Sequence, residues 1–109
     1  DVMLLATCTG NTLARLAMGL TDGPVLMAAK AHLRNEKPLL IALASNDALG
    51  LNAKNLGLLL AAKQIYFVPL GQDDPLKKPN SLIFDDKLLL PAAAAALQRQ
   101  QLQPVLREF

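Results

Sequence analysis

Residues 2–20, with the sequence VMLLATCTGNTLARLAMGL, decide the fold. The apolar run over residues 2–6 predicts a strand, and Leu13, Leu16 and Leu20 recur with the spacing of one helix face. Six small or polar residues separate these two segments and predict a tight loop. In open α/β sheets, ligands bind where a strand ends and the next helix begins, so this loop is the first candidate site.

Residues 7–12 are expected to contact a cofactor, and they are Thr7, Cys8, Thr9, Gly10, Asn11 and Thr12. Glycine frees the φ angle and permits close backbone approach, while the hydroxyl and amide side chains supply hydrogen-bond donors and acceptors. Asn11 has a second interpretation as the N-cap of the following helix, and the loop by itself does not decide between the two. Cys8 is a weak candidate for a nucleophile, because the single histidine, His32, falls in a different predicted helix.

Length and charge limit the class of protein. The 109 residues, 52% of them apolar, predict one α/β domain over residues 1–109. Eleven basic and nine acidic residues give a net charge of +2, and the basic residues are scattered, which argues against a nucleic-acid partner. No apolar stretch approaches the roughly 20 residues of a membrane span. A lone cysteine suits a reducing compartment, so we expect a cytoplasmic protein without membrane contact.

The rest of the chain alternates between further predicted helices and strands. Residues 39–44 form an uninterrupted apolar run, typical of a parallel strand that is covered on both faces. Residues 82–84 are apolar but stay unassigned. The other predicted elements are a helix at 24–34, a helix capped by Asn52 that includes 56–63, a strand at 65–70, an alanine-rich helix at 87–101 and an edge strand at 104–106. This alternation predicts a parallel sheet with helices on its faces.

Two more polar segments are candidate binding sites. Residues 45–52 follow the second strand as residues 7–12 follow the first, so we expect both loops to border one cleft. Asn46 and Asp47 either bind a substrate or form an Asx turn. Residues 71–81 form the longest polar stretch, in which Lys77 and Lys78 either meet an anionic substrate or are solvated surface charges.

Several catalytic and metal-binding patterns are absent from the sequence. It has no Gly-x-Gly-x-x-Gly fingerprint, no phosphate loop ending in Gly-Lys-Ser/Thr and no Gly-x-Ser-x-Gly elbow. No Cys, His or carboxylate cluster has the spacing of metal ligands, so no metal site is expected. His32 is interpreted as a partly buried residue near the end of its helix.

Two motifs carry a resemblance to a known family. Residues 5–17, with the sequence LATCTGNTLARLA, are similar to the Pro-Ala-Ser-Ala-Asn-Thr segment and following helix of the flavoproteins related to the flavin-containing cysteine decarboxylases. Residues 41–46, with the sequence IALASN, fall where that family carries a Pro-x-Met-Asn motif. Further phrases at residues 45–52, 65–73, 77–81 and 101–105 extend the resemblance over essentially the whole chain.

The resemblance implies a Rossmann-like, doubly wound parallel sheet that binds FMN and assembles into homo-oligomers. By position, Thr9, Asn11 and Thr12 take over the family's flavin and substrate loop, and Asn46 takes over its motif asparagine. The most similar branch of the family acts in bacterial spore formation, together with a dehydrogenase-like partner that uses a nicotinamide cofactor, NAD(P). The two proteins together oxidise a small dicarboxylate of the dihydropyridine type to an aromatic ring, which requires removal of a hydride and a proton.

The chain departs from the family motif in three places. Leu43 replaces its proline, Ser45 replaces its methionine, and residues 49–50 stand where a Met-Trp pair follows, which argues against decarboxylation of a cysteine derivative. The resemblance places the family's catalytic histidine, and the turn that holds the FMN phosphate, before the matched region. We therefore expect the C-terminal half of such a domain, inactive by itself. The alternative functions are an FMN-dependent decarboxylase and a non-catalytic activating subunit.

Overall fold

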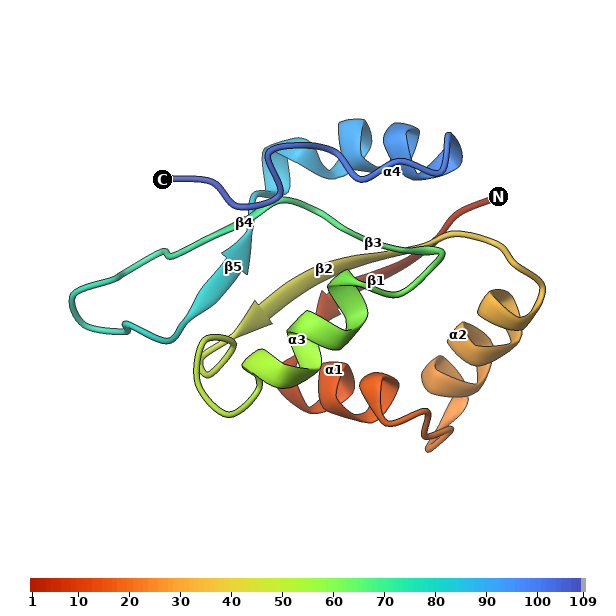
Figure 1. Ribbon diagram of the computed structural model, residues 1–109, viewed down its shortest axis with the longest axis horizontal. Helices are drawn as coiled ribbons and strands as arrows, with labels where there is room; N and C mark the ends of the chain where they lie inside the picture. Colours follow the sequence, from red (N-terminus) through yellow and green to blue (C-terminus); the bar gives the residue numbers. More distant parts are fainter. Residues whose placement is uncertain (109) are drawn as a thin grey trace.

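The fold is built around β2 (Leu39–Ser45), a strand of seven residues of which all but Ala44 are buried. The computed structural model describes residues 1–108 (Figure 1). The other elements, in chain order, are β1 (Met3–Cys8), α1 (Gly10–Ala17), α2 (Pro24–Arg34), α3 (Ala53–Leu60), β3 (Ile65–Phe67), β4 (Leu70–Gly71), β5 (Leu82–Phe84), a 3-10 turn (Asp86–Leu88) and α4 (Leu89–Leu97).

Strand pairing around β2 makes the sheet mixed. β1 lies along one edge of β2 and runs parallel to it, with Met3 opposite Leu39. On the other edge, β3 pairs in parallel with the first half of β2, and β5 pairs antiparallel with its end. β4 pairs antiparallel with β5. The prediction of an α/β fold is confirmed, and the predicted parallel sheet is found in β1, β2 and β3. Two short strands that the prediction did not include as separate elements, β5 and β4, extend this sheet in the antiparallel direction.

The strand predicted at residues 65–70 divides into β3 and β4, with Val68 and Pro69 between them. The N–H of Val68 still donates to the carbonyl of Ile41 at 2.9 Å. The N–H of Leu70 donates to the carbonyl of Val105 at 2.7 Å and not to β2, so the ladder with β2 ends at Val68. The carbonyl of Pro69 instead accepts from the N–H of Asp85 at 2.8 Å. The remaining edge of β2 is occupied by β5, the apolar segment at residues 82–84 that the sequence left unassigned.

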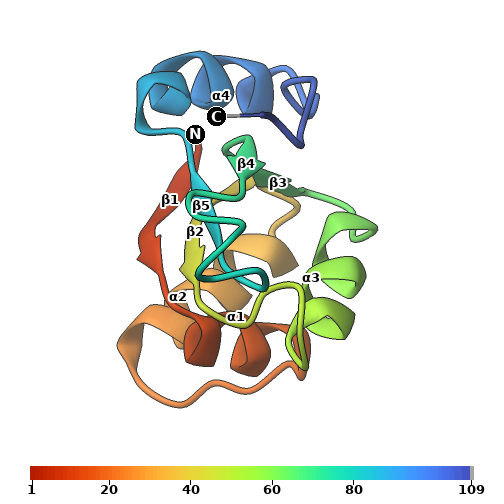
Figure 2. The ribbon, with the colours of Figure 1, turned by 90° about the vertical axis from the view of Figure 1, so that its left-hand side faces the viewer.

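The sheet separates two layers of helices. Helices α1, α2 and α3 cover one face, and α4 covers the other, as Figure 2 shows. Along β2, Leu39, Ile41 and Leu43 belong to the core on the side of α1–α3, whereas Leu40 and Ala42 pack with α4. Alternate side chains of a strand point to opposite faces, so a strand that is covered on both sides needs an uninterrupted apolar sequence.

The segment after α4 returns along the sheet edge without forming a strand. α4 ends at Leu97, earlier than the helix predicted for residues 87–101. The side-chain amide of Gln101 then pairs with the backbone of Phe67: the Phe67 N–H donates to Oε1 at 2.8 Å, and Nε2 donates to the Phe67 carbonyl at 2.6 Å. The strand predicted at residues 104–106 is reduced to one bridge between Leu106 and Leu70. A side chain therefore covers this edge of β3 in place of a strand.

Replacing Gln101 with alanine is expected to destabilise the fold by about 1–3 kcal/mol, because the N–H and carbonyl of Phe67 lose their partners. Urea unfolding followed by circular dichroism measures the change. Gln100→Ala is the matched control, since the Gln100 side chain is exposed and accepts or donates no hydrogen bond within residues 1–108. The control should change the free energy of unfolding by no more than about 0.5 kcal/mol. Equal stability of the two variants would contradict the role assigned to Gln101.

Candidate functional site

The loops that follow β1 and β2 border one cleft of about 610 Å³. Because β1 and β2 are adjacent and parallel, both loops emerge at the same edge of the sheet. This confirms the prediction that the two loops share a cavity. The β4–β5 segment closes a third side of it. The polar lining consists of Thr9, Asn11, Ser45, Asn46, Asp47, Asn52, Lys54, Asn55, Asp73 and Ser81.

The first loop is shorter than the sequence predicts, because β1 runs through Cys8 and α1 begins at Gly10. Thr9 is the N-cap of α1, and its Oγ1 accepts from the N–H of Thr12 at 3.3 Å. The alternative interpretation of Asn11 as the cap is therefore wrong. Asn11 lies in the first turn of α1, is exposed and lines the cleft.

Three residues expected at the cofactor site lie outside the cleft lining: Thr7, Cys8 and Thr12. Thr7 is exposed on β1, and the hydroxyl of Thr12 hydrogen-bonds with that of Thr9 at 3.2 Å. Cys8 is 1% exposed and belongs to the core between the sheet and α1–α3. Burial raises the pKa of its thiol to about 12, so the thiol stays neutral near pH 7 and is a poor nucleophile.

Gly10 is required by close packing rather than by its φ angle. A Cβ at this position would lie 2.8 Å from Ser45 Oγ and 2.9 Å from Asn52 Nδ2. Contacts this short force one of the partners to move, and both partners here are polar atoms of the cleft wall. The start of α1 is thus pressed against the β2–α3 loop at a distance that only glycine permits.

Asn52 links the two loops of the cleft. It occupies the N-cap position of α3, as predicted, but its side chain makes no capping bond. Instead Nδ2 donates to the carbonyl of Gly10 at 2.9 Å, and Oδ1 accepts from Asn55 Nδ2 at 2.7 Å. Asn52 is 6% exposed, so these bonds are shielded from water. Sequence reasoning missed this role because residues 10 and 52 become neighbours only through the pairing of β1 with β2.

Asp47 is also held by the wall of the cleft. Its Oδ1 accepts from Ser45 Oγ at 2.8 Å and from Asn52 Nδ2 at 3.5 Å, and its N–H donates to Ser45 Oγ at 3.3 Å. Its carbonyl accepts from the N–H of Gly50 at 2.9 Å, so the segment is a backbone turn. The expected Asx turn is not formed within residues 1–108, because Asp47 Oδ1 accepts only from Ser45 and Asn52. A turn does not exclude a ligand, because Asn46 and Asp47 are both exposed and both line the cleft.

Lys77 and Lys78 lie outside the cleft lining, contrary to the expectation that they meet the substrate there. Both side chains are exposed, and their backbone N–H groups donate to Asp74 within the β4–β5 segment. This segment brings Asp73 and Ser81 to the cleft instead, and α3 brings Lys54. The sequence gives no sign of Asp73 and Ser81, since their approach depends on how β5 joins β2. Lys54 reaches the cleft because it lies in the first turn of α3, next to the loop that follows β2.

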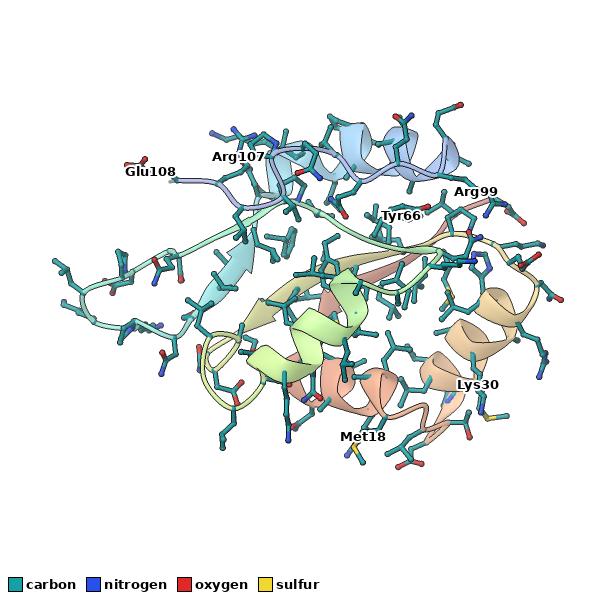
Figure 3. The ribbon with its side chains drawn as sticks, viewed as in Figure 1. Met18, Lys30, Tyr66, Arg99, Arg107 and Glu108 are labelled. Atoms are coloured by element: carbon teal, nitrogen blue, oxygen red, sulfur yellow. The ribbon has the colours of Figure 1, made fainter. Side chains whose placement is uncertain are left out.

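The charge of the cleft is sparse. Its lining holds two carboxylates, Asp47 and Asp73, and one lysine, Lys54, while the other polar groups are neutral amides and hydroxyls. Figure 3 shows two of the other basic residues, Lys30 and Arg99, at the end of the molecule opposite the carboxyl end of β2. The cleft is therefore suited to a ligand that is recognised mainly through neutral hydrogen bonds.

Neither a metal centre nor a membrane span is found among residues 1–108. No group of three or more Cys, His, Asp or Glu side chains in this range is arranged to hold a metal ion. No helix in the same range is both long and apolar enough to cross a membrane. His32 bonds instead to the backbone, with Nε2 at 2.8 Å from the carbonyl oxygen of Pro38.

Gly10→Ala is expected to destabilise the protein by about 1–3 kcal/mol, because the added methyl group overpacks the junction between α1 and the β2–α3 loop. The shift of the thermal unfolding midpoint measures this. Gly57→Ala is the matched control, because a Cβ there meets nothing within 4 Å. This change inside α3 should stabilise the protein by about 0.5–1 kcal/mol. A Gly10→Ala protein as stable as the wild type would show that the close approach is not needed.

Comparison with known proteins agrees with this architecture. Residues 1–96 match the family model described as Flavoprotein. The B subunit of dipicolinate synthase from Bacillus subtilis is 52% identical over 108 residues, which is 99% of this chain and 54% of that protein. The crystal structure of the dipicolinate synthase B subunit from Bacillus halodurans superposes with a TM-score of 0.97 at 52% identity, and the match covers 99% of this chain and 55% of that one.

The chain spans about half the length of the relatives that it matches. The resemblance carried by residues 5–17 and 41–46 is confirmed by these matches, and so is the Rossmann-like character of the fold. With a family model that matches most of the sequence and a relative that is identical at half of the aligned positions, the chain belongs to the flavoprotein family.

Proposed function

We propose that this protein is the flavin-binding subunit of a dipicolinate synthase, and that it works with a dehydrogenase-like partner, the A subunit of the enzyme, during bacterial spore formation. Together they oxidise a dihydrodipicolinate-type precursor to dipicolinate. The observation that carries the proposal is the amide-lined cleft at the ends of β1 and β2, in a chain that is 52% identical to the B subunit of a dipicolinate synthase.

The donor set of the cleft fits the ring system of a flavin. The isoalloxazine ring is flat and uncharged, and one edge carries two carbonyl groups and an N–H. Side-chain amides match such an edge, and Asn46 and Asn55 both line the cleft. Gly10 offers a wall without a side chain beside them. A volume of about 610 Å³ accommodates a ring of this size.

The phosphate of the proposed cofactor, FMN, is matched less fully by the described residues. In the cleft lining, Lys54 is the one cationic side chain, and the first N–H groups of α1 are the other anion-binding feature. A phosphate group would take further ligands from outside the cleft. The role of this chain is therefore to bind and orient the ring and the substrate.

A bound flavin would supply a hydride acceptor, and the residues of this chain would hold the substrate ring against it. The exposed amide of Asn11 is the proposed ligand of the substrate carboxylates, with Lys54 as the nearby positive charge. Holding the substrate ring in one orientation against the flavin lowers the entropic part of the activation barrier. The dehydrogenase-like partner would contribute NAD(P), and we propose that several copies of this protein associate into a homo-oligomer in the cytoplasm.

FMN binding by the purified full-length protein tests this proposal. Titration followed by flavin absorbance and fluorescence quenching should give a saturable complex. Asn46→Ala should weaken FMN or substrate binding about fivefold or more, because a neutral hydrogen bond contributes about 1 kcal/mol. Lys77→Ala is the control, since Lys77 is outside the cleft lining, and it should change binding less than about twofold.

Three results would contradict the proposal. If the full-length protein bound no FMN, with or without its dehydrogenase-like partner, the assignment of FMN as the cofactor would be wrong. If the dehydrogenase-like partner alone formed dipicolinate at the full rate, this chain would have no role in dipicolinate synthesis. Release of CO2 from a carboxylated thiol substrate would favour the decarboxylase alternative instead.

A further inference from the structure

The carboxylate of Asp47 is the most unusual group in the cleft. A negative charge is unexpected where an anionic dicarboxylate is proposed to bind, and the side chain is exposed to the cavity rather than paired with a cation. Both salt bridges found within residues 1–108 lie elsewhere, between Lys37 and Asp1 and between Arg107 and Asp85. Within residues 1–108, the carboxylate of Asp47 is therefore open to a ligand in the cleft.

The two oxygens of this carboxylate have different surroundings. Oδ1 accepts from Ser45 Oγ at 2.8 Å and from Asn52 Nδ2 at 3.5 Å. Within residues 1–108, no hydrogen bond reaches Oδ2. Ser45 and Asn52 are 8% and 6% exposed, so both donors are fixed in the wall of the cleft. The wall thus orients the carboxylate through one oxygen and leaves the other as an acceptor for a ligand.

The orientation is fixed by a second layer of contacts. The amide of Asn52 cannot turn over, because its Nδ2 also donates to the carbonyl of Gly10 and its Oδ1 accepts from Asn55. The side chain of Asn55 lines the same cleft, as does that of Asn46 beside Asp47. Two amides and a carboxylate acceptor therefore border the cavity together, which suits an edge with two carbonyl groups and one N–H.

We infer that Asp47 recognises the ring N–H of the flavin and excludes ligands that lack this donor. The inference rests on the proposed flavin site and makes it specific. The oxidised isoalloxazine ring has a single N–H, at N3, between two carbonyl groups. An ionised acceptor makes a stronger hydrogen bond to such a group than a neutral one does. The anionic substrate is then bound away from Asp47, which reassigns this residue from the substrate to the cofactor.

The test compares FMN with 3-methyl-FMN, in which a methyl group replaces the N–H. Dissociation constants are measured by fluorescence quenching with full-length wild-type protein, Asp47→Asn and Asp47→Ala. FMN should bind at least about tenfold more weakly to both variants, while 3-methyl-FMN should change less than about threefold. Asp47→Ala also leaves room for the methyl group of 3-methyl-FMN. If Asp47 acted only by excluding that methyl group sterically, this variant would bind FMN as the wild type does.

Two further variants separate recognition from folding. Ser45→Ala removes the hydroxyl that orients Oδ1 and should weaken FMN binding less than Asp47→Asn does. Asp22→Asn removes one negative charge from the exposed loop between α1 and α2, outside the cleft lining, and should leave both affinities as in the wild type. A purely structural role for Asp47 would weaken both flavins equally and lower the thermal midpoint.

Each outcome has one meaning. Equal loss of both flavins in the Asp47 variants, or no loss of FMN, overturns the role of Asp47 and leaves the flavin site intact. Equal affinity of the wild-type protein for FMN and 3-methyl-FMN would also overturn the role of Asp47 and leave the flavin site intact. Wild-type protein that binds neither flavin overturns the proposed function, and the inference about Asp47 falls with it.

Discussion

The close approach of α1 to the β2–α3 loop is the constraint on which the candidate site depends. At Gly10 the backbone comes so near to Ser45 and Asn52 that a Cβ would lie under 3 Å from both. Asn52 closes this junction with a hydrogen bond to the Gly10 carbonyl at 2.9 Å. The two loops therefore behave as one wall, and the positions of Asn11, Asn46 and Asp47 are set relative to each other.

The sheet beneath this wall is tightly packed on both faces. β2 contributes apolar side chains alternately to the cores on its two faces, and Leu39, Ile41 and Leu43 are each 0% exposed. Removing such side chains from water is the main favourable contribution to folding, and it holds β1 and β2 together, although their register shifts between Ala6 and Cys8, where β1 approaches the cleft. A ligand site at these ends does not have to be ordered by the ligand, which lowers the entropy lost on binding.

The polar character of the cleft bears on how the two subunits of the proposed enzyme would divide its work. Two carboxylates and one lysine leave the lining without enough positive charge to neutralise a dicarboxylate. Amides, which are neutral, bind a flavin edge or a carboxylate through directed hydrogen bonds rather than through long-range attraction. A site lined by amides is therefore specific for the shape and the hydrogen-bond pattern of its ligand. The negative charge of a dicarboxylate would have to be neutralised by groups outside the described cleft.

The sequence alone determined the fold class, the central buried strand, the two loops that share the cleft and the family, because apolar periodicity and local motifs depend on neighbouring residues. The identities of Asn11, Asn46 and Asp47 as cleft residues follow from the same local pattern. Only the tertiary structure decided that Leu70 leaves β2 to bond with Val105, that residues 82–84 form an antiparallel β5, and that Asp73 and Ser81 reach the cavity. It also decided that Cys8 faces the core and that Asn52 bonds across the loops. These features depend on contacts between segments far apart in the chain, and no local pattern encodes which distant residues will meet.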